Sequence, residues 1–103
     1  MNMLQRLFGS ATAVNLQEVI ADGAFLVDVR TAGEFANGHV KGSVNIPVDS
    51  IASGISRFNN KKHIIVFCRS GNRSGMAKSI LEQHGFTNVI NGGTWEQVSK
   101  FVQ

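Results

Sequence analysis

The sequence predicts an α/β domain with a central, mostly parallel sheet of about five strands and helices on both faces. Short apolar runs typical of strands alternate along the chain with segments that carry helix-capping signals, which is the pattern of strand–helix–strand units. The run Ile64–Phe67 is apolar at every position, as expected of a strand buried on both faces of a parallel sheet. A length of 103 residues suits one domain. We therefore predict a single domain over residues 1–103, with residues 1–12 as a candidate frayed extension.

The first half of the chain contains two predicted helices, each followed by a strand. In the first helix Asn15 is the expected N-cap and Gly23 the expected stop, and Phe25–Val29 follows as a buried strand. The segment TAGEFANG (31–38) repeats these signals, with threonine as the N-cap, glutamate three positions later and glycine at the end. The segment SVNIP (43–47) then predicts a short strand closed by the only proline.

The second half contains three predicted helices and two strands. DSIASGISRF (49–58) predicts a short helix before the apolar strand. A longer helix follows that strand, ends at Gly85, and allows Phe86 to fold back in a Schellman-type close. The core face of this helix is predicted to carry four apolar residues: Met76, Ala77, Ile80 and Leu81. NVIN (88–91) predicts the last strand, and TWEQVSKFV (94–102) predicts a last helix with apolar residues spaced to face a core.

The only cysteine, Cys68, directly follows the apolar strand and precedes the polar loop RSGNRS. In parallel sheets ligands bind beyond the carboxyl ends of the strands, and Asp28 and Arg30 lie at the end of their own strand, at that same edge. Free cysteine is often a core residue, and this alternative explains the apolar run before Cys68. It does not explain two arginines and a glycine turn after it, so we favour a functional cysteine.

The loop after Cys68 contains groups that stabilise a thiolate. Its backbone N–H groups can turn inward, Gly71 permits the backbone angles that such a cradle needs, and a helix N-terminus adds partial positive charge. Arg69 and Arg73 add full positive charge nearby. The thiolate is the nucleophilic form of cysteine, and the same cradle would hold an anion bonded to the sulfur. Two reactions remain open from these residues, attack on phosphorus and attack on sulfur.

Composition and spacing disfavour several other classes of function. The net charge of +3 suits a small anion, but the basic residues are scattered, so nucleic-acid binding is not expected. No stretch of the sequence reaches the roughly 20 apolar residues of a membrane span. His39, His63 and His84 lack ligand spacing with Cys68 or with one another, so no metal site is expected. A lone cysteine fits a reducing compartment, and we expect a cytoplasmic protein whose N-terminal segment is a weak candidate for a targeting signal.

Three segments of the chain resemble the rhodanese family. CRSGNRS (68–74) is similar to the active-site loop of rhodanese-type sulfurtransferases, VDVRTAGEFANGHVKGSVNIP (27–47) resembles the family's other signature, and NVINGGTW (88–95) resembles its final strand and glycine pair. These segments occur in family order and cover most of the chain from about Asn15 onward. The resemblance implies a rhodanese-like α/β domain whose cysteine picks up and passes on sulfane sulfur.

The resemblance also implies a mechanism. Cys68 attacks the outer sulfur of a small anionic donor such as thiosulfate, sulfite leaves, and Cys68 becomes a persulfide. The persulfide is bound by the backbone N–H groups of six loop residues: Arg69, Ser70, Gly71, Asn72, Arg73 and Ser74. Arg69 attracts the donor, and Arg73 is the second candidate for this role. Cyanide, a thiol or a thiol-bearing protein accepts the sulfur, no metal or organic cofactor is needed, and the domain is expected to be a monomer.

Loop length favours sulfur chemistry over phosphate chemistry. The second loop arginine falls at the fifth position after the cysteine, at Arg73, whereas cysteine phosphatases place it at the sixth, which is Ser74 here. A small phosphatase or arsenate reductase is therefore the disfavoured alternative. The runner-up is a non-catalytic rhodanese module that binds persulfide or delivers it to a partner protein.

Asp28, Arg30 and Glu34 are expected to support the site structurally. We predict that Arg30 pairs with Asp28 or Glu34 rather than contacting substrate, and that Arg73 is a candidate internal brace. One departure from the family pattern concerns Trp95, which follows the glycine pair after only one residue. The loop that rims the pocket is therefore expected to be shorter or shifted, which leaves the donor preference open.

Overall fold

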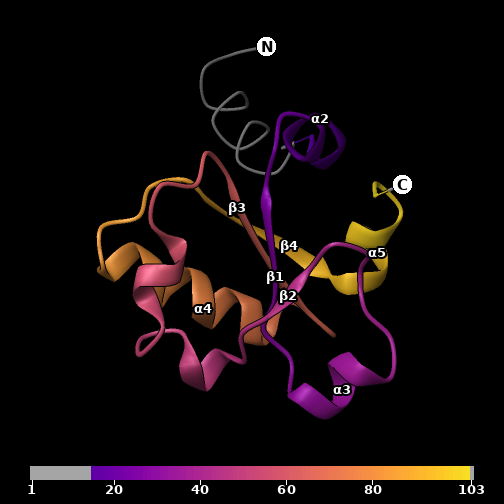
Figure 1. Cartoon of the computed structure of the whole chain (residues 1–103), viewed down its shortest axis with the longest axis horizontal. Coiled ribbons are helices and arrows are strands. Elements are labelled where there is room, and N and C mark those ends of the chain that lie inside the picture. The colour runs from indigo at the N-terminus through magenta and orange to yellow at the C-terminus, as the bar shows by residue number, and fades with distance from the viewer. Residues whose placement is uncertain (1–14, 103) are drawn as a thin grey trace, which may run out of the picture.

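The computed structural model describes residues 15–102, and strands alternate with helices along this part of the chain (Figure 1). The strands are β1 (Phe25–Asp28), β2 (Val44–Asn45), β3 (Ile64–Cys68) and β4 (Val89–Thr94). The α-helices are α2 (Leu16–Ala21), α3 (Ala32–Ala36), α4 (Asn72–Gln83) and α5 (Trp95–Ser99). Two 3₁₀ helices, η1 (Val48–Ser50) and η2 (Ile55–Phe58), lie between β2 and β3. The predicted extension at residues 1–12 lies outside the described residues.

The strands form one parallel sheet in the order β2-β1-β3-β4. The central strand β3 is buried at all five of its positions, as its apolar sequence predicts. The described residues contain four strands, whereas about five were predicted. The four strands that the sequence predicted by segment, at residues 25–29, 43–47, 64–67 and 88–91, correspond to β1, β2, β3 and β4.

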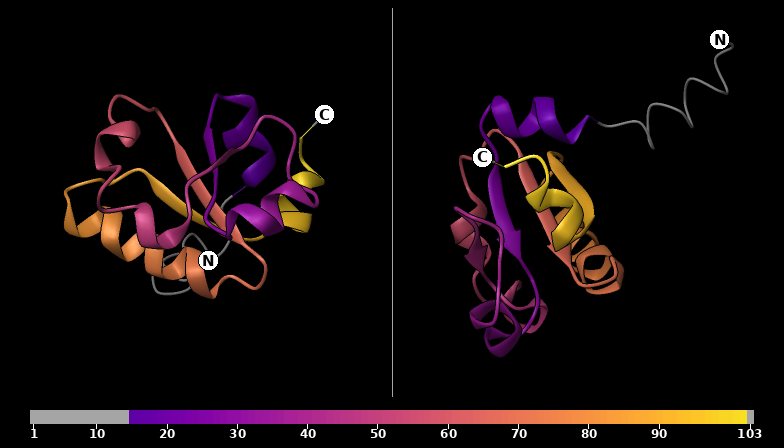
Figure 2. Two further views of the ribbon diagram at one scale, coloured as in Figure 1. Left: turned by 60° about the horizontal axis from the view of Figure 1, so that its bottom comes forward. Right: turned by 90° about the vertical axis from the view of Figure 1, so that its right-hand side faces the viewer.

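Helical segments cover both faces of the sheet, and alternate residues of β3 divide between the two cores. Ile64, Val66 and Cys68 belong to the core under α4 and the 3₁₀ helices, whereas Ile65 and Phe67 belong to the core that includes α2 and α5. Figure 1 shows α4 on one side of the strands and α5 on the other, and Figure 2 shows α2 next to the C-terminal segment. The α/β class with helices on both faces is therefore confirmed.

Local capping signals define the helix ends as predicted. The Asn15 side chain accepts a hydrogen bond from the Glu18 N–H at 3.0 Å, and Thr31 forms a complete capping box at the start of α3. At the end of α4, Gly85 adopts a positive φ of 94° and the Phe86 N–H donates to the Leu81 carbonyl at 3.1 Å. This is the predicted Schellman close. None of the helices described is long and apolar enough to cross a bilayer.

Two predictions from helical periodicity are wrong. Residues 49–58 form parts of two 3₁₀ helices instead of one short α-helix, and Gly54 lies between them. Met76 was placed on the core face of α4 but is 59% exposed. The inward face of α4 is formed instead by Ser74, Ala77 and Leu81. The apolar pattern missed this face because one of its members, Ser74, is polar.

Candidate active site

Cys68 is the last residue of β3, and its thiol lies at the carboxyl edge of the sheet. The residue is fully buried. Gly71 is the N-cap of α4 with a positive φ of 98°, and this conformation lets its N–H turn back and donate to Cys68 Sγ at 3.0 Å. The loop therefore closes on the sulfur within three residues, directly before the N-terminus of a twelve-residue helix.

The surroundings of Cys68 lower the pKa of its thiol below the ordinary value. Burial alone raises the pKa, but hydrogen bonding with the Ser74 hydroxyl and with the N–H groups of Ser74, Ser70 and Gly71 outweighs it. Three of the six loop residues expected to cradle the sulfur thus direct an N–H toward it. Asn72 is exposed, and its own N–H donates to the Ser70 hydroxyl at 3.5 Å. The hydrogen bonds with the sulfur stabilise the thiolate of Cys68 relative to the thiolate of an unperturbed cysteine.

Arg73 is bound to a carboxylate. Its guanidinium donates to Glu34 with two hydrogen bonds, of 2.6 and 3.1 Å, in a bidentate ion pair that joins α4 to α3. Hydrogen bonding to Arg73 and to the Thr31 backbone lowers the pKa of Glu34 to about 2, and the pKa of Arg73 is raised by the same pair. Arg73 thus has the geometry of an internal brace, and its charge is already neutralised.

Asp28 and Arg30 form the ion pair that was expected of Arg30. Both side chains are buried, and the Arg30 guanidinium donates to both Asp28 carboxylate oxygens at 2.7–3.0 Å. A further bond of 2.7 Å to the Gly38 carbonyl fixes its outer end, and the guanidinium lies 4.6 Å from the centre of the Trp95 ring. The stacking of Arg30 on Trp95 connects the end of β1 to the start of α5.

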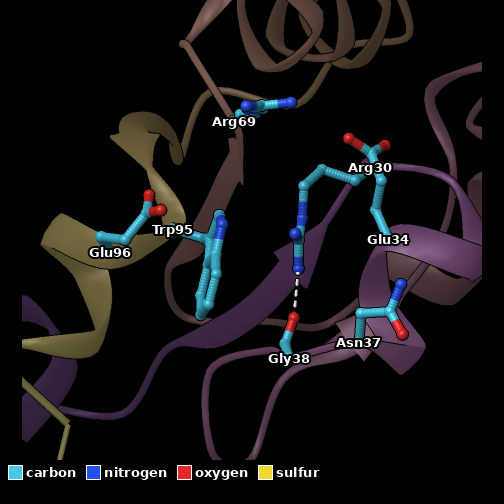
Figure 3. Close-up of a pocket in the computed structure, with 7 residues that line it drawn as sticks. All are labelled: Arg30, Glu34, Asn37, Gly38, Arg69, Trp95 and Glu96. Atoms are coloured by element: carbon cyan, nitrogen blue, oxygen red, sulfur yellow. Dashed lines mark hydrogen bonds between the residues drawn. The ribbon is translucent and has the colours of Figure 1, made fainter.

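A pocket of about 290 Å³ lies beside the cysteine loop (Figure 3). Figure 3 shows the Trp95 ring and the Arg30 side chain side by side in its middle, with Arg69 above them. The seven lining residues are Arg30, Glu34, Asn37, Gly38, Arg69, Trp95 and Glu96. Cys68 does not line this pocket. Arg69 is exposed, and no ion pair of Arg69 occurs within residues 15–102.

Sequence reasoning missed the role of Asn91 in this region. Its side chain accepts from the Ser74 hydroxyl at 2.7 Å and donates to the Gly71 carbonyl at 3.2 Å, so it contacts both ends of the cysteine loop. Its position directly before the glycine pair was the available signal. Trp95 was noted only for its spacing, yet it forms a wall of the pocket. Within the described residues, no group of three or more histidine, cysteine or acidic side chains could hold a metal ion.

Comparison with known proteins agrees with this geometry. The rhodanese-like domain family matches residues 12–97. The thiosulfate sulfurtransferase PspE of Escherichia coli is 33% identical over 75 residues, covering 71% of this chain and 72% of the relative. The putative sulfur carrier protein YrkF of Bacillus subtilis is 34% identical over 76 residues, covering 73% of this chain but only 41% of the relative.

A solved rhodanese with anions from Escherichia coli superposes with a TM-score of 0.66 at 32% identity, covering 73% of this chain and 91% of that one. The fold, the sequence signatures and these relatives agree with one another. The chain therefore belongs to the rhodanese-like domain family, whose members include thiosulfate sulfurtransferases and putative sulfur carriers.

Proposed function

We propose that this protein is a sulfurtransferase that moves sulfane sulfur through a persulfide on Cys68. The observation that carries the proposal is the closed loop around the sulfur, in which the Gly71 N–H donates to Sγ at 3.0 Å at the head of α4. That loop favours an anion on the sulfur, which both the attacking thiolate and the resulting persulfide require. Similarity to the Escherichia coli thiosulfate sulfurtransferase supports thiosulfate as the donor.

The reaction consists of two balanced half-reactions. The Cys68 thiolate attacks the outer sulfur of thiosulfate, a new S–S bond forms, and the old S–S bond breaks with its electron pair leaving on sulfite. The persulfide then gives its outer sulfur to cyanide or to a thiolate, and the Cys68 thiolate is regenerated. Two half-reactions that share a covalent intermediate give ping-pong kinetics. Because Cys68 has no exposed surface, the exchange needs a movement of the loop or of the thiol.

The loop residues have different roles in this proposal. Backbone N–H groups of the loop, those of Ser70, Gly71 and Ser74 first among them, bind the terminal sulfur of the persulfide. Arg69 is the cation that attracts the donor, because it lines the pocket while Arg73 is occupied by Glu34. No metal or organic cofactor takes part. The acceptor comes from outside the domain, because the chain has no second cysteine.

The test is the intact mass of the protein after incubation with thiosulfate, compared with a Cys68→Ser variant. We expect a gain of one sulfur on the parent chain alone and its loss on addition of cyanide, with thiocyanate released. If neither chain gains mass while both are folded by circular dichroism, thiosulfate is not the donor. If the Cys68→Ser variant gains the sulfur equally, Cys68 is not its site.

A sulfur-carrier module is the second candidate function, and the similarity to the putative sulfur carrier of Bacillus subtilis favours it. Such a module would form the Cys68 persulfide but release it slowly to cyanide and faster to a thiol-bearing protein. Steady-state thiocyanate production separates the two functions. A phosphatase is the third alternative, and hydrolysis of a phosphate ester that is lost in Cys68→Ser would support it.

The proposed location is the cytoplasm, and the proposed assembly is a monomer. A single unpaired cysteine suits a reducing compartment, which supports the cytoplasm. In the part of the chain that the structure describes, two clusters of buried apolar residues form the cores, and Met76 is the large hydrophobic residue that is exposed. This surface supports a monomer. Size-exclusion chromatography with light scattering tests it, and a dimer at micromolar concentration would contradict it.

A further inference from the structure

Asn91 lies on the α4 side of the sheet because of its place in β4. β3 pairs Val66 with Asn91 and Phe67 with Gly93, so Gly92 is the extra residue of a bulge. Residues before the bulge keep the strand alternation, in which Val89 belongs to the α4 core. Asn91, two positions later, therefore faces the first turn of α4, where its amide nitrogen lies 3.6 Å from a Cβ position on Gly75.

Backbone neighbours fix the orientation of the Asn91 amide. Its oxygen accepts a hydrogen bond from the Gly93 N–H at 2.9 Å, and its nitrogen donates to the Gly71 carbonyl at 3.2 Å. A flipped amide would place donor against donor and acceptor against acceptor at these two groups. The oxygen of Asn91 therefore faces Ser74, and it accepts from the Ser74 hydroxyl at 2.7 Å.

The Ser74 hydroxyl has a single proton and two acceptors that compete for it. The residue is fully buried, so water does not supply a replacement. While the proton points to Asn91, the hydroxyl oxygen can only accept from the thiol of Cys68, whose Sγ lies at 3.5 Å. When Cys68 is a thiolate, the hydroxyl can stabilise it only by turning away from Asn91. The short bond to Asn91 thus opposes the step that activates the sulfur.

We propose that Asn91 is a positioning residue that restrains Cys68 in its thiol form by holding the Ser74 hydroxyl proton. The inference rests on the proposed function only in that the thiolate is the reacting form. On this proposal the N–H groups of the cysteine loop and the Asn91 side chain have opposite effects on the ionisation of Cys68. The loop stabilises the thiolate, and Asn91 limits how much of it is present before a donor arrives.

The charged residues around the sulfur belong to several elements, and the test substitutes none of them. Arg69 belongs to the loop after β3, and Arg73 in α4 is paired with Glu34 of α3. The Asp28–Arg30 pair lies at the end of β1, and Glu96 of α5 lines the adjacent pocket. None of these groups is replaced in the variants below, so a difference between variants reports on Asn91 and Ser74.

The experiment titrates the thiolate directly by its absorbance near 240 nm. The chain has one cysteine and no tyrosine, so a Cys68→Ser blank leaves the Cys68 thiolate as the signal. No donor is added, so the result does not depend on whether the protein transfers sulfur. We expect Asn91→Ala to lower the pKa of Cys68 by about one pH unit, since one hydrogen bond to an ionised group is gained. Asn91→Asp should raise that pKa, because it keeps an acceptor toward Ser74 and adds negative charge.

Two controls make the test specific. In a Ser74→Ala background, Asn91→Ala should leave the pKa of Cys68 unchanged, because no hydroxyl proton remains to be released. Asn88→Ala is the matched surface control, since the Asn88 amide donates to the Lys61 and Lys62 carbonyls away from Cys68. A higher pKa in Asn91→Ala would overturn the proposal and show that Asn91 supports the thiolate by holding Gly71. An equal shift with and without the Ser74 hydroxyl would also overturn it.

Discussion

Gly92 and Gly93 are neighbours in β4, but the structure requires glycine at each for a different reason. A Cβ on Gly92 would lie 2.8 Å from Val98 Cγ2 and 2.9 Å from Ile65 Cγ2, inside the core under α5. Gly93 has a positive φ of 82°, and a Cβ there would meet no atom within 4 Å. Substitution of Gly92 is therefore limited by packing, whereas substitution of Gly93 is limited by backbone conformation.

We predict that Gly92→Ala lowers the free energy of unfolding by about 1–2 kcal/mol. The two contacts are about 1 Å shorter than the optimum of ~3.5–4.0 Å between carbon atoms, so the neighbouring side chains must move. Overpacking of this kind costs roughly 1–3 kcal/mol. The φ of Gly92 is open to other residues, so the reduced flexibility of the unfolded chain offsets about 0.4–1 kcal/mol of that cost.

The assay is urea unfolding followed by circular dichroism, on single and double variants. Val98→Ala removes one of the two clashing methyl groups, so the cost of Gly92→Ala should fall by at least about 0.5 kcal/mol in that background. Gly93→Ala is the matched control. It should cost about 1–2 kcal/mol through its left-handed backbone, with no dependence on Val98. Gly93→Asn should cost less, because asparagine tolerates this conformation.

Either of two results would refute this reasoning. One is a Gly92→Ala variant as stable as the parent chain. The other is a cost of Gly92→Ala that is the same with valine and with alanine at position 98, which would remove the steric explanation.

Three further predictions concern the charged groups of the site. Asp28→Asn leaves the buried Arg30 without its anionic partner and should cost about 3–5 kcal/mol in urea unfolding, and a cost under 1 kcal/mol would contradict a buried pair. Because the folded-state pKa of Glu34 is depressed from 4.5 to about 2, the Glu34–Arg73 pair stabilises the fold above the unfolded pKa and loses this effect as pH falls from about 4.5 toward 2. Urea midpoints should therefore drop less steeply over that range in Glu34→Gln, and parallel curves would show that the pair does not contribute. On the proposed function, Arg69→Ala should raise the KM for thiosulfate about three- to tenfold with a smaller change in kcat, and an unchanged KM would remove Arg69 from donor binding.

Features that depend on neighbouring residues were predictable from the sequence. The N-caps at Asn15 and Thr31 and the close at Gly85 each need only a few consecutive residues, and all three are present. The apolar run of β3 identified the central strand for the same reason. The position of Cys68 at the carboxyl edge followed from chain order, since the residue after a parallel strand lies at that edge.

Features that depend on distant residues were not predictable with the same certainty. Whether Arg30 or Arg73 takes the Glu34 carboxylate depends on the packing of α3 against α4, and both choices are compatible with the spacing. Met76 was assigned to the core because it is apolar, but α4 buries Ser74, Ala77 and Leu81 instead. Ser74 contacts Asn91 in another element, which the helical pattern alone does not reveal. Asn91 was predicted only as part of the final strand, and its direction follows from the alternation of β4 after Val89 and from its hydrogen bond with Ser74.

The ion pair between Glu34 and Arg73 has a consequence for protein engineering. It connects two residues that lie 39 positions apart in different sequence signatures, so the cysteine loop cannot be transferred to another protein by itself. A graft of residues 68–74 into another scaffold would carry an arginine whose carboxylate stays behind in the donor protein. The unmatched cation would then be free to rearrange the loop or to attract a different anion. Chimeras between members of this family should therefore exchange the α3 segment and the cysteine loop together.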